Sequence, residues 1–330
     1  RRARVRALQA QAQAPQALEA RAWAKVNLAL DIVGKRPDGY HDIETVMHRI
    51  ELADDIEVVR DKDPVSAGEP VITVEVTGVA GLDVSGVPCG RGNIAFRAAQ
   101  AFLARLGFRG ASVSIRIRKR IPVGAGLGGG SADAAAVLVA MNRLWENPLG
   151  REQLMAVGAS IGADVPFCLA NNDAAFAQGI GDRLTPLPGL LGVGLLLVNP
   201  GYAVSTSDAY AKWDARHTRD GGARARALAR AIAAGRAEGD GGPDLRRICA
   251  LLSNDFEPLV AEEHGQVLHL KQLLMQAGAI GALMSGSGPT VFGVYDSPGQ
   301  AEAAAVVFGS RADSHIRVIP SCTCTGARES

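Results

Sequence analysis

A glycine-rich segment at residues 121–133, with the sequence IPVGAGLGGGSAD, is the part of the chain best suited to chemistry. It follows an alternating run, SVSIRIRK, that is typical of a strand, and it precedes a helical pattern that begins near Ser131. Glycines let backbone N–H groups surround a charged oxygen, and the first turn of a helix adds unpaired N–H groups and the positive end of its dipole. The sequence therefore predicts a phosphate-binding loop between a strand and a helix.

Gly124, Gly126 and Gly129 also satisfy the dinucleotide-binding pattern GxGxxG. The arginines that alternate through the preceding strand disfavour this interpretation, because a central parallel strand is apolar on both faces. The loop lacks the Lys-Ser/Thr pair of a P-loop and the chain contains neither HRD nor DFG, which argues against a P-loop enzyme and a protein kinase. A loop that only turns the chain is the remaining alternative, and the entropic cost of so many glycines argues against it.

Three further groups of polar residues could take part in a reaction at such a loop. Lys25 and Asn27 lie on one face of a strand predicted around residues 24–31. Asp164, in the sequence GADVP, is a candidate to accept a proton from an alcohol, and an aspartate at this place could equally cap a turn. Tyr40 and His41 follow a Pro-Asp-Gly turn, where an aromatic ring beside a histidine suits a nucleobase as well as an ordinary protein surface.

These segments together resemble a known superfamily. Residues 122–135, with GADVPF at 162–167 and SGSGPT at 285–290, are similar to the three signature regions of the GHMP small-molecule kinases. AKVNL and RPDGYH resemble one family within it, the 4-diphosphocytidyl-2-C-methyl-D-erythritol kinases of the non-mevalonate isoprenoid pathway. The resemblance spans roughly residues 21–320. It implies a two-domain α+β GHMP kinase fold, with a ribosomal protein S5 domain 2-like N-terminal domain and a ferredoxin-like C-terminal domain.

The resemblance also implies an activity, the ATP-dependent phosphorylation of the substrate's 2-hydroxyl by direct in-line transfer. It implies that Asp164 acts as the base and that Lys25 is its electrostatic partner. The implied ATP-binding residues are Pro122, Val123, Gly124, Ala125, Gly126, Leu127, Gly128, Gly129, Gly130, Ser131 and Ala132.

On the substrate side, the resemblance implies that His41 binds the cytosine between Tyr40 and Tyr210. The implied substrate-binding residues are Asn27, Tyr40, His41, Thr206 and Tyr210. Mg²⁺ is expected to accompany ATP, with Ser131 as a candidate contact and the other metal ligands unknown.

Two alternatives to this function are open. Another GHMP small-molecule kinase is the nearest, and the cytosine pocket distinguishes it, because homoserine or mevalonate offers no base to hold. A non-catalytic nucleotide-binding regulator on the same fold is the other. Lys25 and Asp164 together argue against a regulator, since binding alone needs neither.

The composition is that of a folded protein without a strong net charge. Of 330 residues, 35 are Lys or Arg and 34 are Asp or Glu, so the net charge of +1 recruits neither nucleic acid nor an anionic membrane. No apolar run reaches the roughly 20 residues that cross a bilayer. Five cysteines without CxxC spacing indicate reduced thiols. We therefore expect a cytoplasmic enzyme with a small-molecule partner, no nucleic-acid or membrane partner, and an oligomeric state that the sequence leaves open.

The expected organisation is a disordered extension at residues 1–20, an N-terminal ATP-binding domain at 21–187 and a C-terminal domain at 188–330. The boundary is placed at the PLPG segment. The segment 211–244 is rich in Arg, Ala, Gly and Asp, and is expected to be an exposed, partly helical insertion without chemistry. Before the glycine loop, Asn93 is expected to cap a helix that stops at Gly107.

Overall fold

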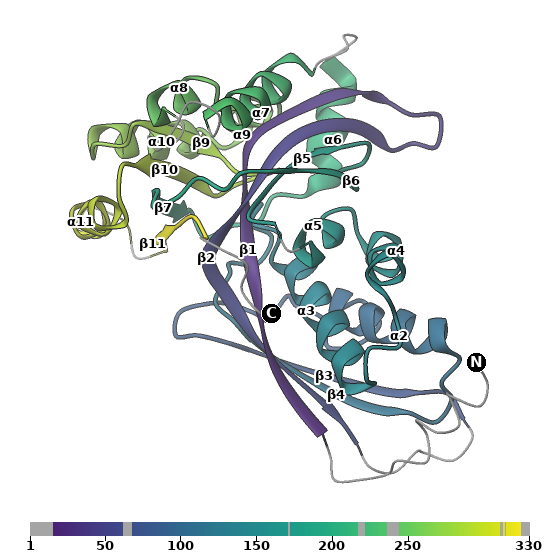
Figure 1. The fold of residues 1–330 in the computed structure, drawn as a ribbon. Helices are drawn as coiled ribbons and strands as arrows, with labels where there is room; N and C mark the ends of the chain where they lie inside the picture. The colour runs from purple at the N-terminus through teal and green to yellow at the C-terminus, as the bar shows by residue number, and fades with distance from the viewer. Residues whose placement is uncertain are drawn as a thin grey trace.

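The computed structural model describes residues 16–61, 68–170, 172–216, 222–235, 244–310, 313 and 315–324. It contains a seven-stranded and a four-stranded sheet, with helices packed against both, and this confirms the α+β architecture (Figure 1). None of the helices in these residues is long and apolar enough to cross a membrane.

A long antiparallel hairpin of the first two strands dominates the first sheet, whose main path has the order β3-β4-β2-β1-β8. β5 pairs with β2 and with β6, outside that path. The pairs β3·β4 and β1·β8 are parallel, and the others are antiparallel. The strands are β1 (Gln16–Lys35), β2 (His41–Arg60), β3 (Val71–Gly78), β4 (Ser112–Lys119), β5 (Ala174–Gln178), β6 (Arg183–Leu187) and β8 (Ser253–Asn254).

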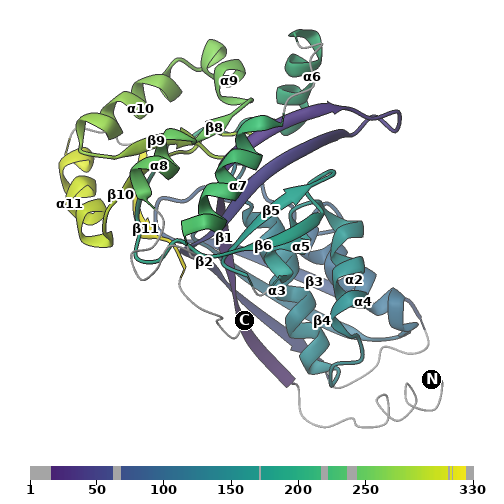
Figure 2. The same ribbon diagram turned by 45° about the horizontal axis from the view of Figure 1, so that its top comes forward.

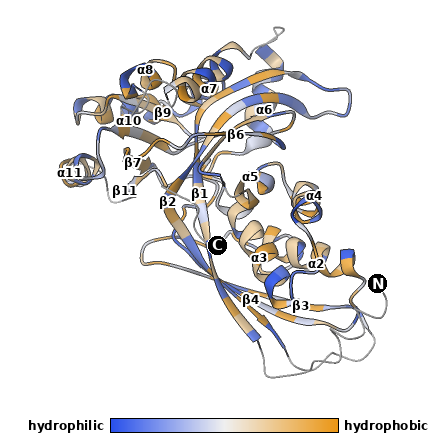
Figure 3. Cartoon of the chain, viewed as in Figure 1, coloured by the Kyte–Doolittle hydropathy of each residue, from blue (hydrophilic) through white to orange (hydrophobic). Residues whose placement is uncertain are grey.

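The alternation in β4 gives this sheet one covered face and one open face. Val113, Ile115 and Ile117 are buried, whereas Arg116 and Arg118 are exposed. Apolar and polar residues correspondingly alternate along the strands of this sheet (Figure 3). The strand predicted before the glycine loop is confirmed, and its covered face packs under alanine-rich helices.

The helices on the covered face include the one that follows the glycine loop (Figure 2). Asn93 caps α2 by accepting a hydrogen bond from the backbone N–H of Ala95, and Gly107 ends it in the left-handed conformation, as expected. The next helix begins at Gly129, with Gly128 as its N-cap, so Ser131 lies inside its first turn. These helices are α2 (Ile94–Leu106), α3 (Gly129–Leu144), α4 (Arg151–Ile161) and α5 (Val165–Leu169).

The second sheet has the order β11-β7-β10-β9, and its inner strand β7 is buried along its whole length. Its strands are β7 (Gly194–Asn199), β9 (Gly281–Met284), β10 (Val291–Tyr295) and β11 (Arg317–Cys322). The helices of this part of the chain are α6 (Thr206–Arg216), α7 (Ala223–Gly235), α8 (Leu245–Ala250), α9 (Glu257–Glu263), α10 (Gln266–Gln276) and α11 (Pro298–Gly309).

Two expectations about organisation differ from the structure. Strand β1 begins at Gln16 and Ala20 is buried, so residues 16–20 belong to the sheet, while residues 1–15 lie outside the described residues. The segment 211–244 is partly helical, as expected, but it is not an exposed insertion, because α7 buries Leu228 and Ile232 against β1 and β2. In the sequence, arginines interrupt the apolar residues of α7, so the narrow apolar stripe is not apparent from the composition of the segment. Residues 217–221 and 236–243 of that segment lie outside the described residues.

The chain passes from the first sheet to the second between Leu187, where β6 ends, and Gly194, where β7 begins. The second half of the chain nevertheless meets the first sheet along a seam at β8. β8 pairs with β1 at Ala29 and Leu30, and the backbone N–H of Ile32 donates to Asp255 Oδ2 at 2.8 Å. Residues beyond the expected boundary therefore complete the first sheet.

Candidate active site

A cleft of about 930 Å³ lies where the glycine loop meets β1, β2 and α6. Its lining brings together segments that are far apart in the sequence. Among them are the loop itself, the turn between β1 and β2, the start of α5 and the Gly286-Ser287 loop.

The glycine loop is shaped by backbone that other residues rarely adopt. Gly124, Gly126 and Gly128 all have positive φ values, of 63°, 75° and 70°. At Gly126, an added Cβ would lie 2.0 Å from the carbonyl oxygen of Ser285. Because α3 begins directly after the loop, its first N–H groups have no partner within the helix. The loop thus has the free donors and the close packing that phosphate binding requires.

Contacts from both halves of the chain hold this loop. The backbone N–H of Lys25 donates to the carbonyl of Leu127 at 3.0 Å. From the second half, Ser285 Oγ donates to the carbonyl of Gly126 at 2.9 Å and accepts from the backbone N–H of Asn27 at 3.2 Å. One serine thus joins the glycine loop to the strand that carries the predicted lysine.

Lys25 and Asp164 meet in the cleft, with Nζ 3.4 Å from Oδ2. The lysine side chain is only 5% exposed, whereas that of Asp164 is 32% exposed, so the carboxylate is the member of the pair open to a substrate. Asp164 precedes α5, but its side chain makes no capping hydrogen bond. The alternative of a capping aspartate is therefore not what the structure shows.

Asn27 fixes the direction of the Lys25 ammonium. Lys25 Nζ donates to Asn27 Oδ1 at 2.6 Å, and Asn27 Nδ2 donates to Thr45 Oγ1 at 2.8 Å. The Thr45 hydroxyl in turn donates to the carbonyl of Ala29. This chain of buried hydrogen bonds leaves the ammonium one rigid position beside Asp164.

The aromatic residues gather at the other end of the cleft. The His41 ring stacks on Tyr210 with centroids 4.4 Å apart and an interplanar angle of 13°, and it meets Trp213 edge-on at 5.6 Å. Burial raises the pKa of Tyr210 to about 12, so its hydroxyl stays protonated. Tyr40 is 62% exposed at the rim. All three predicted aromatic residues therefore border one cavity, but His41 occupies part of the Tyr210 face expected to receive a base.

Two protein-family models match this chain, and both agree with the geometry of the cleft. The model of the GHMP kinases N terminal domain matches residues 93–172, and that of the GHMP kinases C terminal domain matches residues 228–312. The 4-diphosphocytidyl-2-C-methyl-D-erythritol kinase of Citrifermentans bemidjiense is 43% identical over 288 residues, which cover 87% of this chain and 93% of that protein. The chain belongs to this family of GHMP kinases.

A second relative and two solved structures agree. The kinase of the same name from Pelotomaculum thermopropionicum is 42% identical, covering 84% of this chain and 88% of that protein. A crystal structure of 4-(cytidine 5'-diphospho)-2C-methyl-D-erythritol kinase matches with a TM-score of 0.68 and 32% identity, covering 92% of this chain and 99% of that one. A homoserine kinase from Cytophaga hutchinsonii shares the fold, with a TM-score of 0.67, 17% identity and coverage of 93% and 95%. The GHMP kinase fold is thereby confirmed.

The remaining predicted residues of this GHMP kinase, apart from Ala132, also border the cleft. Thr206 begins α6, and its hydroxyl forms a hydrogen bond of 2.8 Å with that of Ser287, which links α6 to the Gly286-Ser287 loop. Ser131 lines the cleft from the first turn of α3. Every residue from Pro122 to Ser131 lines the cleft, and Ala132 follows within α3, where it is buried.

Sequence reasoning missed a buried charge network beneath the glycine loop of the kinase. Lys119 Nζ contacts Asp54 and lies 2.7 Å from Asp133 Oδ2, and all three side chains are almost fully buried. Asp54 also accepts from the backbone N–H groups of Arg120 and Ile121. Burial raises the pKa of Asp133 to about 8; the Asp54 carboxylate adds to this rise and the Lys119 ammonium opposes it. Asp54 lies 65 residues from Lys119 along the chain, so no local pattern indicates the network.

Asp214 is the second functional candidate that the sequence did not suggest. Its Oδ1 lies 2.6 Å from His41 Nε2, and its Oδ2 lies 2.5 Å from Lys35 Nζ. Asp214 belongs to α6, in the segment expected to have no chemistry, and lies 173 residues from His41.

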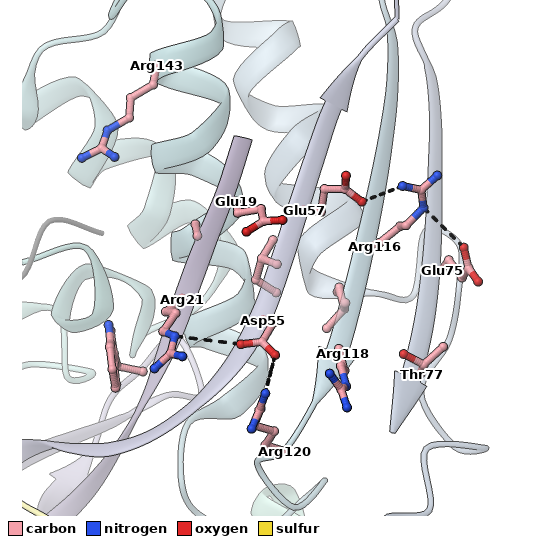
Figure 4. Close-up of a pocket in the computed structure, with 14 residues that line it drawn as sticks. Glu19, Arg21, Asp55, Glu57, Glu75, Thr77, Arg116, Arg118, Arg120 and Arg143 are labelled. Carbon is pink, nitrogen blue, oxygen red and sulfur yellow. Dashed lines mark hydrogen bonds and ion pairs between the residues drawn. The ribbon is translucent and has the colours of Figure 1, made fainter. Parts of the chain in front are cut away.

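A second hollow, of about 840 Å³, lies on the open face of the first sheet of the kinase (Figure 4). Its guanidinium groups are largely matched by carboxylates on neighbouring strands, as expected for a solvated sheet face. The ion pairs are Arg21–Asp55 (4.0 Å), Arg120–Asp55 (2.8 Å), Arg116–Glu57 (2.6 Å) and Arg116–Glu75 (3.8 Å). The glycine loop, Lys25 and Asp164 make the cleft the candidate active site.

Proposed function

We propose that this kinase transfers the γ-phosphoryl group of ATP to the 2-hydroxyl of 4-diphosphocytidyl-2-C-methyl-D-erythritol, a step of isoprenoid precursor synthesis. The observation that carries the proposal is the Lys25–Asp164 pair, which borders the same cleft as the glycine loop and the His41–Tyr210 stack. The names of the relatives support the choice of substrate.

In the proposed reaction the substrate oxygen attacks the γ-phosphorus of ATP in line with the bond that breaks. Asp164 accepts the hydroxyl proton as the new oxygen–phosphorus bond forms. The bond from the γ-phosphorus to the bridging oxygen breaks, and its electron pair leaves with ADP. Lys25 stabilises the negative charge that develops on the attacking oxygen and on the phosphoryl group. No covalent intermediate with the enzyme is needed.

The phosphates of ATP are assigned to the glycine loop, from Pro122 to Ala132, and to the N-terminus of α3. Mg²⁺ supplies further neutralisation of phosphate charge when bound. It prefers oxygen ligands and usually keeps several waters and substrate phosphates in its shell. The described residues include no cluster of three or more His, Cys, Asp or Glu that could hold a metal by themselves. The Ser131 hydroxyl borders the cleft from the first turn of α3, and its oxygen fits an ion that arrives with ATP.

The cytosine is assigned to the aromatic end of the cleft. A base that hydrogen-bonds to the edge of His41 lies in the plane of that ring, and therefore continues over the face of Tyr210 on which His41 is stacked. Tyr40, exposed at the rim, then covers the other side of the base. Asn27, between Lys25 and Thr45, orients the alcohol end of the substrate near Asp164.

The test is ADP release by the purified protein with ATP and Mg²⁺. The proposed cytidine substrate, homoserine, mevalonate and galactose are offered separately. We expect turnover with the cytidine compound alone. Turnover with another of these alcohols would contradict the assigned base pocket while retaining kinase activity. ATP binding without turnover of any of the four would favour the regulator over the kinase.

A further inference from the structure

The contact between Asp214 and His41 determines where the histidine carries its proton. Hydrogen bonds from Lys35 and His41 lower the pKa of Asp214, so this carboxylate is ionised near neutral pH. An ionised carboxylate only accepts hydrogen bonds. His41 Nε2, 2.6 Å from Asp214 Oδ1, must therefore carry the N–H.

A neutral imidazole with its proton on Nε2 has an acceptor at Nδ1. The structure shows no hydrogen bond to His41 Nδ1 from the described part of the chain, and His41 borders the cleft. Tyr210 stacks against one face of the ring and Trp213 meets it edge-on, so the ring is held in one orientation. The cleft therefore presents a fixed hydrogen-bond acceptor at its aromatic end.

This acceptor distinguishes the two common pyrimidine bases. The 4-position of cytosine carries an amino group, which donates, whereas that of uracil carries a carbonyl oxygen, as thymine does, which accepts. An acceptor at Nδ1 pairs with the amino group and opposes the carbonyl. A histidine with its proton on Nδ1 would have the reverse preference.

We propose that Asp214 is a positioning residue that sets the base specificity of this kinase, by holding the His41 proton on Nε2 and so making Nδ1 the acceptor for a cytosine amino group. The proposal rests on the proposed function, which places a pyrimidine beside His41. It assigns to α6 a task beyond supplying Tyr210: the same helix brings the ring that packs against His41 and the carboxylate that orients its proton.

The alternative is that Asp214 only anchors α6 to the end of β1, through its ion pair with Lys35. A purely structural contact would alter stability or weaken both nucleotides equally. It would leave the ratio of cytidine to uridine affinities unchanged, and this ratio is the quantity to measure.

The experiment compares binding of CDP and UDP to the full chain by titration calorimetry at pH 8. We expect the unmodified kinase to bind CDP at least about 10-fold more tightly than UDP, since opposed acceptors cost a buried site about as much as a lost hydrogen bond. In Asp214→Asn the amide can donate to Nε2 and shift the ring proton to Nδ1. That variant should lose most of the preference, chiefly through weaker CDP binding, and keep its affinity for ATP.

A matched control makes the same change elsewhere on the helix. Asp208→Asn alters the first turn of α6, where the side chain is exposed, and should keep the full CDP preference. Nitrogen-15 chemical shifts of the His41 ring give an independent measurement, with a protonated Nε2 expected in the unmodified protein and a protonated Nδ1 in Asp214→Asn.

Two results would overturn the assignment of Asp214. One is an unchanged ratio of CDP to UDP affinity in Asp214→Asn, and the other is a proton on Nδ1 in the unmodified kinase. Failure of the unmodified kinase to bind CDP at all would be a different result, because it would remove the proposed cytidine substrate itself and the specificity proposal with it.

Discussion

The two ends of the cleft are built in opposite ways. At the end assigned to the phosphates, here called the phosphate end, one contiguous segment supplies the loop, and the proposed functional groups are backbone N–H groups whose positions follow from glycine conformations. At the end assigned to the cytosine, here called the base end, the proposed groups are side chains, and they come from a turn near residue 40 and a helix near residue 210. The groups of the first end are neighbours in the sequence, whereas those of the second end come together only in the folded chain.

Because of this difference, we expect substitutions at the two ends to affect different ligands. Substitutions at the phosphate end should impair catalysis or ATP binding and leave cytidine binding intact. Substitutions at the base end should weaken cytidine binding and leave ATP binding intact. In the proposed reaction, phosphoryl transfer occurs where the two ends meet, at Lys25 and Asp164.

The largest effect is expected from Asp164→Asn, which removes the proposed proton acceptor between the two ends. Loss of a general base lowers turnover by about 10²–10⁴-fold. Affinity for both ATP and CDP should stay within about a factor of three, because neither ligand needs that proton transfer in order to bind. Turnover is measured by ADP release and affinity by calorimetry. Unchanged turnover would remove Asp164 from the mechanism.

The next effect is expected from Gly126→Ala at the phosphate end. Its φ of 75° disfavours alanine, and the added methyl would collide with the carbonyl of Ser285. We expect kcat/KM for ATP to fall by about 10²-fold or more, with CDP binding retained, as the loop loses its geometry. Gly107→Ala is the matched control: its φ is 71°, but no atom lies within 4 Å of the new Cβ and it is remote from the cleft. Equal losses in the two variants would contradict a special role for the loop.

A smaller effect is expected from Tyr210→Ala at the base end. Stacking of a base on an aromatic ring contributes about 1–3 kcal/mol, so CDP binding should weaken by about 5- to 150-fold while ATP binding is unchanged. Calorimetry with each nucleotide measures both affinities. A matching loss of ATP affinity would show that the two ends are not separate and that the pocket is assigned to the wrong base.

The smallest effect concerns the buried charges beneath the glycine loop and is a matter of stability. The pKa of Asp133 is about 8 in the folded chain and near its ordinary value of 3.8 in the unfolded chain. Between these values folding takes up a proton, so this residue lowers the free energy of unfolding as the pH rises from about 4 to 8. Asp133→Asn removes that dependence.

Urea unfolding at pH 5 and at pH 8 provides the measurement. The stability of Asp133→Asn relative to the unmodified kinase should increase by at least about 1 kcal/mol between the two values, since one pKa unit corresponds to about 1.4 kcal/mol. Parallel stabilities at the two pH values would mean that Asp133 is ionised in the folded state and that Lys119 neutralises both carboxylates.

The sequence predicted the arrangement of strand, glycine loop and helix well because its determinants are local. The alternation in β4, the glycines and the start of α3 adjoin one another, so the residues themselves locate the loop and indicate its chemistry. Asn93 and Gly107 likewise mark the ends of α2 through their own backbone preferences. The GHMP resemblance supplied Lys25 and Asp164 as partners across 139 residues of sequence.

The contacts missed by the sequence analysis are those between distant side chains. Asp214 has no distinctive neighbours in the sequence, and the alanines and arginines that dominate its segment suggest a solvated insertion. Only the packing of α6 and α7 against the first sheet brings that carboxylate to His41. Lys119 was predicted as a strand residue, but its burial between Asp54 and Asp133 depends on a strand pairing that no pattern specifies.

The seam at β8 also has a consequence for synthesis of the chain. Strand β1 leaves the ribosome well before its partner at Ala29 and Leu30, which follows more than 200 residues later, and Asp255 lies 223 residues beyond Ile32. At a synthesis rate of 5–20 residues per second, this edge of β1 stays unpaired for roughly 10–45 s before β8 has been made. An uncovered strand edge is a template for pairing with other chains. The nascent kinase therefore passes through a period of aggregation risk that ends only when its second half has been made.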